Sequence, residues 1–134
     1  MEPLRIVARY IDGRTVKGLS FNLSPDKDRF HVYLADEPSG KTVEVWMKEL
    51  KAIFFVRDFV GNSQYNERKD YVEGDRPSGR KIEVTFRDRE VLVGTTFGYD
   101  PKRPGFFVFP PDPKSNNVRV FVVTTSVGKV RFFQ

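Results

Sequence analysis

The feature that most constrains the fold of this 134-residue chain is an internal repeat. When the sequence is shifted by 76 residues, apolar, turn and glycine positions of the first half meet similar residues of the second half. The aligned pairs include Ile6 with Ile82, Gly18 with Gly94, Phe21 with Phe97, Phe30 with Phe106, Val32 with Val108, Asp36 with Asp112 and, after one inserted residue, Val43 with Val120. Such positions determine a fold, so the sequence predicts two copies of one unit of about 55 residues.

Each copy has the pattern of a small β-barrel. Apolar and polar residues alternate in short segments, and Asp12-Gly13 is a strong signal for a tight turn between two of them. Gly18 and Gly94 each interrupt a strand pattern, which indicates a bend or bulge. Five short strands with a single helical turn before the last are typical of SH3-like and Sm-like barrels.

We therefore expect an all-β fold of two tandem, five-stranded SH3-like or Sm-like barrels that pack together. The barrels are assigned to residues 1–56 and 80–134, and the polar residues 57–79 form a linker with at most one short helix. Two linker structures stay open, a helix capped by Ser63 or an extended surface strap, and we favour the strap. The helix would align Tyr65, Lys69 and Val72, whereas the strap would be anchored by Phe59, Tyr65 and Tyr71.

The hairpin predicted for Gly105–Val123 is apolar on both faces. One face suits a core, and Phe107, Phe109 and Phe121 on the other face need a cover, because large apolar patches are uncommon on monomers. We favour a seam between the two barrels. A surface for a protein partner or a homodimer, and a ligand groove, remain as alternatives.

Catalytic and metal-binding patterns are absent from the sequence. It contains no cysteine and one histidine, His31, and no phosphate-loop, dinucleotide-binding, zinc-protease or EF-hand motif occurs. Asp36 and Asp112 recur at one turn, where capping of the backbone explains both. We expect a protein that is not an enzyme and that uses no cofactor or metal.

The charge balance is basic, with a net charge of +5 and a pI near 9.6. The 18 acidic residues are interspersed among the 23 basic ones, so we rank nucleic acid and nucleotides behind a protein partner. No apolar run is long enough to span a membrane. Because the chain lacks cysteine, we expect a cytoplasmic location.

One polar cluster is the best candidate for ligand binding. It comes from two loops that we expect to meet at one end of the second barrel, where cations beside amide donors could hold a phosphate or carboxylate. The alternative is a solvated rim, in which case replacing Lys114 or Asn116 leaves the stability unchanged. The cluster consists of Lys102, Arg103, Lys114, Asn116, Asn117 and Arg119.

The segment IVARYIDGRTVKGLSFNLSPDKDRFHVYL resembles the first motif of Sm-like proteins, with its DGR turn and strand glycine. The resemblance implies an Sm-like fold and RNA binding. The second Sm motif has no counterpart, because residues 47–50 read MKEL where its RG turn would lie.

The segments LKAIFFVRDFVGN, GRKIEV and GFFVFPPDPKSNNVRVFVV resemble an uncharacterised bacterial family that occurs alone or attached to signalling modules. This resemblance implies a non-enzymatic binding or scaffolding module of unknown ligand, accessory to bacterial signalling.

A third resemblance, to the PilZ receptors of cyclic dinucleotides, comes from Arg5 and Arg9 in an RxxxR pattern and from Asn22 and Ser24. Lys27 stands where the PilZ motif has a glycine. RNA or cyclic dinucleotide binding is therefore the alternative function.

Overall fold

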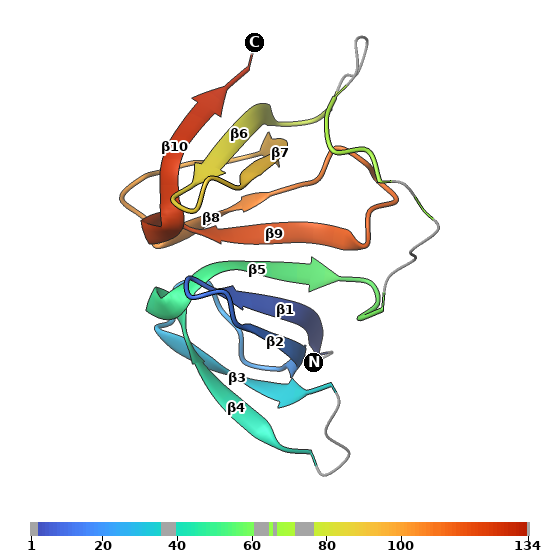
Figure 1. Cartoon of the computed structure of the whole chain (residues 1–134), viewed down its shortest axis with the longest axis vertical. Helices are drawn as coiled ribbons and strands as arrows, with labels where there is room; N and C mark the ends of the chain where they lie inside the picture. The colour runs from blue at the N-terminus through green and yellow to red at the C-terminus, as the bar shows by residue number, and fades with distance from the viewer. Residues whose placement is uncertain (1–2, 36–39, 61–64, 66, 72–76, 134) are drawn as a thin grey trace.

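The structure is all-β, and its strands form two halves that lie one above the other (Figure 1). The computed structural model describes residues 3–35, 40–60, 65, 67–71 and 77–133, and no α-helix occurs among them. The first half contains β1 (Leu4–Tyr10), β2 (Thr15–Ser20), β3 (Arg29–Leu34), β4 (Thr42–Trp46), the 3-10 helix η1 (Met47–Glu49) and β5 (Leu50–Val56). The second half contains β6 (Arg80–Phe86), β7 (Val91–Thr96), β8 (Gly105–Val108), β9 (Asn117–Val123), the 3-10 helix η2 (Thr124–Ser126) and β10 (Val127–Phe132).

The strands pair in two antiparallel sheets rather than in two closed barrels. A seven-stranded sheet has the order β4-β3-β2-β1-β5-β9-β8, and a three-stranded sheet has the order β10-β6-β7. The pair of β5 with β9 joins the halves, and Ile53 lies opposite Phe121 in its register. The expected five-stranded closure is therefore not seen, because β5 and β9 pair with each other across the seam.

The hydrophobic cores interlock at this seam. Side chains alternate across a strand, so β5 and β9 each face two layers. Phe121 of the second half is 3% exposed and belongs to the core cluster of the first half, together with Ile53. Conversely, Ala52 of the first half is fully buried in the cluster of the second half. Neither core is complete without a strand from the other half.

The two strand glycines, at which a bend or bulge was expected, pair in regular register and serve a steric purpose instead. A Cβ atom at Gly18 would lie 2.0 Å from the carbonyl oxygen of Tyr33, and one at Gly94 would lie 2.3 Å from that of Phe109. Ile6 lies opposite Gly18 and Ile82 opposite Gly94, in the same register 76 residues apart. The third strand of each half thus approaches the backbone of the second, and only glycine leaves the space.

The linker crosses the second half without regular structure in its described residues. Asp112, in the β8–β9 loop, accepts hydrogen bonds from the Tyr65 hydroxyl and the Arg68 N–H. These bonds and one from the Lys114 N–H lower the pKa of Asp112 to about 2, the Tyr65 bond being the largest cause. The predicted helix cap, Ser63, lies outside the described residues, as does Val72.

Candidate functional site

The six polar residues proposed as a binding cluster do not come together. Lys102 and Arg103 precede β8, whereas Lys114 and Asn116 follow it. The loops on either side of one strand lie at its opposite ends, so the expectation of one site was wrong about this geometry.

Two of these side chains, those of Asn116 and Arg119, have structural contacts instead. The Asn116 side chain accepts the Asp58 N–H at 3.1 Å and donates to the Asp58 carbonyl at 2.8 Å, which fastens the end of β5 to the β8–β9 loop. The Asn117 N–H donates to the Ser115 hydroxyl within that loop. Asn116 is therefore not a free rim residue, because both its amide oxygen and its amide nitrogen bond the Asp58 backbone.

The Arg119 guanidinium lies over two rings, 4.5 Å from the centroid of Phe55 and 4.7 Å from that of Phe107. The guanidinium group therefore lies over the seam, with one ring from each half beneath it. Lys102, Arg103 and Lys114 are exposed in the two loops.

The three aromatic residues proposed for the seam take two different positions. Phe121 is buried in the core of the first half, and the half-buried Phe107 packs against it with ring centroids 5.1 Å apart. Phe109 instead packs edge-on against Phe97, at 5.4 Å. Phe109 therefore lies beside the β7–β8 loop, outside the core clusters.

Six aromatic side chains border an open hollow of about 670 Å³ between β8 and the β7–β8 loop. We call it the aromatic hollow. Arg103 and Asp100 stand at its rim, and Pro25 of the first half completes its wall. Its rings are those of Phe97, Tyr99, Phe106, Phe107, Phe109 and Phe121.

The hollow exists because the β7–β8 ladder stops after one bridge. Thr95 and Phe109 exchange two backbone hydrogen bonds, of 2.9 and 2.8 Å. The Thr96 hydroxyl then bonds the N–H and the C=O of Gly98, at 3.4 and 3.2 Å, and turns the chain away from β8. Phe97 is left 69% exposed. Phe97 and Tyr99 were not predicted as site residues from the sequence, although the glycine between two aromatic residues marks the loop.

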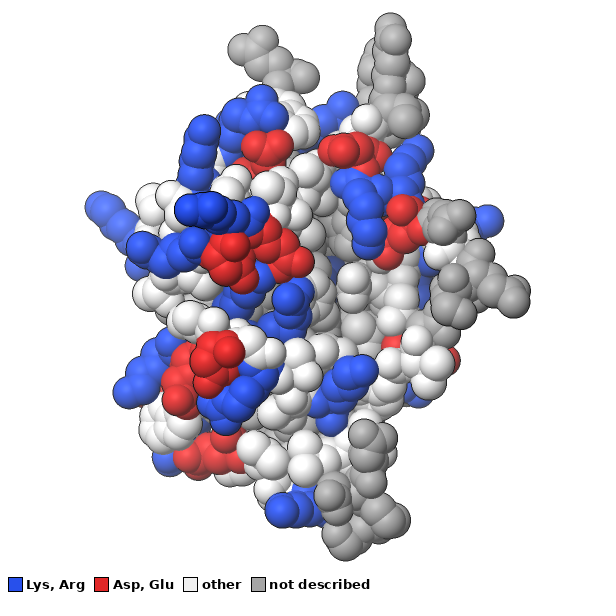
Figure 2. Space-filling view, viewed as in Figure 1, with Lys and Arg blue, Asp and Glu red and all other residues white. Residues whose placement is uncertain are grey.

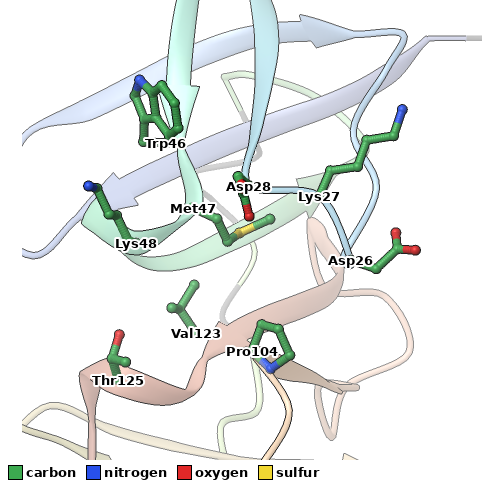
Figure 3. Close-up of a pocket in the computed structure, with 9 residues that line it drawn as sticks. All are labelled: Asp26, Lys27, Asp28, Trp46, Met47, Lys48, Pro104, Val123 and Thr125. Carbon is green, nitrogen blue, oxygen red and sulfur yellow. The ribbon is translucent and has the colours of Figure 1, made fainter.

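A smaller hollow of about 400 Å³ lies beside it and is also built from both halves. Trp46, Met47 and Lys48 come from the first half, and Pro104 and Val123 come from the second (Figure 3). Its floor belongs to the shared core, since Met47 and Val123 are 5% and 3% exposed. Charges of both signs form its rim, from Asp26, Lys27, Asp28 and Lys48.

Basic and acidic side chains alternate over the visible face, without a continuous basic patch (Figure 2). Lys51 of β5 has a side chain only 5% exposed and pairs with Asp88 and Glu90 of the second half. Arg9 of β1 also pairs with Glu90, at 3.2 Å. The hydrogen bond from Lys51 lowers the pKa of Asp88. These charges join the halves to each other.

The residues considered for chemistry have structural partners. The His31 Nδ1 lies 3.2 Å from the Asn22 amide, and its Nε2 lies 3.7 Å from Glu44. Arg5, from the PilZ-like pattern, donates to a backbone carbonyl at 3.3 Å from its place on β1. Within the described ranges, no group of three acidic, histidine or cysteine side chains could hold a metal ion. No helix in the described part of the chain is long and apolar enough to cross a membrane.

Comparisons with known proteins support the expectation of an uncharacterised family. Neither the curated proteins nor the solved structures contain a significant match to this chain. One family model covers residues 2–134, which is almost the whole sequence. The chain belongs to that family, which is described as a family of unknown function (DUF6982).

Proposed function

We propose that this protein is a non-enzymatic binding module that holds a protein partner in the aromatic hollow. The observation that carries the proposal is an open hollow of about 670 Å³ lined by aromatic rings, with Phe97 69% exposed at its mouth. Aromatic side chains are enriched at protein interfaces, where they supply much of the binding energy.

The test compares capture by the intact chain and by two matched variants. Phe97→Ser removes the exposed ring of the hollow, and Phe21→Ser removes the exposed phenylalanine that aligns with it in the first half. Proteins captured from a cell lysate by the wild type and by Phe21→Ser, but not by Phe97→Ser, support the proposal. Equal capture by all three, or capture of nucleic acid without protein, contradicts it.

RNA or cyclic dinucleotide binding is the second candidate. Arg103 borders the aromatic rings, with Lys102 next to it in the chain, and rings beside cations are a common platform for stacked bases. A single-stranded RNA 16-mer and a cyclic dinucleotide are the probes. Affinity that falls steeply with salt favours this candidate, and no retention at low salt removes it.

We also infer that the halves are copies of one SH3-like or Sm-like unit. Both have the same element order and the same glycine environment. They also carry matching aromatic pairs: Phe21 meets Tyr33 edge-on at 5.5 Å, and Phe97 meets Phe109 at 5.4 Å. A structure of a second family member in which the halves have different strand orders would contradict this inference.

The proposal includes an accessory role in cytoplasmic bacterial signalling. Its support is the cysteine-free sequence and the resemblance described above. Co-purification of signalling proteins with the wild type and not with Phe97→Ser, from a bacterium that carries the gene, is the expected result.

A further inference from the structure

The outer edge of β8 faces the aromatic hollow. β8 is the last strand of the seven-stranded sheet. The Pro104 carbonyl accepts a hydrogen bond from the Thr124 N–H at 2.9 Å, just before β8 begins. Hydrogen-bonded and non-bonded pairs alternate along an antiparallel ladder, so Phe106 and Val108 are the β8 residues that bond to β9. By the same alternation, the N–H and C=O of Phe107 point away from β9. The Phe109 backbone points the same way and reaches Thr95.

The first half shows how such an edge is closed. There, β3 also diverges from β2, and the Asn22 side chain accepts the outward His31 N–H at 3.0 Å. Gly98 and Phe107 occupy the corresponding positions 76 residues later. Gly98 has no side chain to make the same bond, so the Phe107 amide faces the hollow.

We propose that an extended peptide segment of a partner protein adds to the outer edge of β8 as a further strand. Its backbone pairs with the N–H and C=O of Phe107, and its apolar side chains contact the rings of Phe97 and Tyr99. This partner class rests on the proposed function. A strand edge offers donors and acceptors at a two-residue spacing, which matches a peptide backbone. The four residues of β8 pair with a segment about 13 Å long.

The first half suggests the variant that tests this proposal, because Asn22 there bonds the outward amide of β3. Gly98→Asn introduces the asparagine that caps the corresponding strand, and Gly98→Ala is its control. A Cβ atom at Gly98 meets nothing within 4 Å, so the alanine control introduces no clash. The probe is a peptide selected from a displayed library of random peptides against the intact protein. Melting temperatures verify that each variant is folded.

The expected result has three parts. The selected peptide binds the wild type and Gly98→Ala within about threefold of each other, and binds Gly98→Asn about tenfold or more weakly, as a lost backbone hydrogen bond implies. Hydrogen exchange of the Phe107 amide slows by about tenfold or more when the peptide binds. Methylation of the peptide nitrogen that pairs with β8 weakens binding by about the same factor.

Two results overturn the inference. If the peptide binds, and Phe97→Ser abolishes binding, but Gly98→Asn and the Phe107 amide show no effect, strand addition is wrong and the proposed function stands. If no peptide is selected, or if sedimentation shows a dimer that Gly98→Asn dissociates, the partner is not a peptide segment. In that case the lysate comparison of Phe97→Ser with Phe21→Ser separately decides the proposed function.

Discussion

Truncating Phe121 should destabilise the first half of the molecule, although the residue belongs to the second. Phe121 is 3% exposed and lies in the first half's core, opposite Ile53 of β5. Removing a fully buried phenylalanine side chain typically costs about 3–5 kcal/mol. Small domains have a total stability of about 5–15 kcal/mol, so Phe121→Ala should lose a large fraction of it.

The single tryptophan provides the assay. Trp46 lies in β4 of the first half, with the Arg29 guanidinium 5.1 Å from its ring. Unfolding in guanidinium chloride is followed by Trp46 fluorescence, which reports the first half, and by far-UV circular dichroism, which reports all strands. Both transitions should shift together in Phe121→Ala. Phe97→Ala, at a residue 69% exposed, is the control and should change the free energy of unfolding by less than about 0.5 kcal/mol.

Either of two results would refute the shared core. The Trp46 transition could keep its wild-type midpoint while circular dichroism shifts, which would show that the halves unfold independently. A loss below about 1 kcal/mol would show that the Phe121 side chain is not buried between them.

Three further predictions concern stability. Asn116→Ala should lower the free energy of unfolding by about 1–3 kcal/mol, because both hydrogen bonds across the seam are lost. The control, Lys114→Ala, should change it by less than about 0.5 kcal/mol. Equal stability of the two variants in urea titrations would contradict the structural role of Asn116. Gly94→Ala should lower the free energy of unfolding by about 1–3 kcal/mol, since its Cβ would lie 2.3 Å from a backbone oxygen, whereas Gly98→Ala should leave it unchanged. Equal melting temperatures for the two variants would contradict the close approach of β8 to Gly94. The pKa of Asp112 is lowered from 3.8 to about 2, so the stability that its carboxylate gives the fold should be present above about pH 4 and lost as the pH falls through about 2. Asp112→Asn should reduce this acid dependence of the melting temperature. An unaltered dependence would mean that the carboxylate does not hold the linker.

Local patterns in the sequence were sufficient to predict the strands. Alternation of apolar and polar residues in Leu4–Tyr10 and the paired glycines Gly18 and Gly94 each correspond to a strand or a close approach in the structure. The single helical turn expected before the last strand is found in the first half as η1, at Met47–Glu49. The alternation and the helical turn depend on neighbouring residues, which a sequence displays directly, whereas the glycines reflect the approach of the third strand of each half.

Strand partners across the seam were not predictable in the same way. The apolar residues of β5 fit closure of a barrel as well as they fit pairing with β9, because either arrangement buries them. The error over the polar cluster has a related origin. Lys102 and Lys114 are close in sequence and similar in character, but one strand separates them and places them at its two ends.

The two halves differ in how the outer edge of their third strand is closed. In both, the third strand diverges from the second beside an aromatic pair. In the first half Asn22 bonds the outward backbone amide of β3. The aligned residue of the second half is Gly98, and there the chain surrounds a hollow of about 670 Å³. An exposed strand edge invites unwanted pairing, so its retention in one half and closure in the other point to a use for the open one.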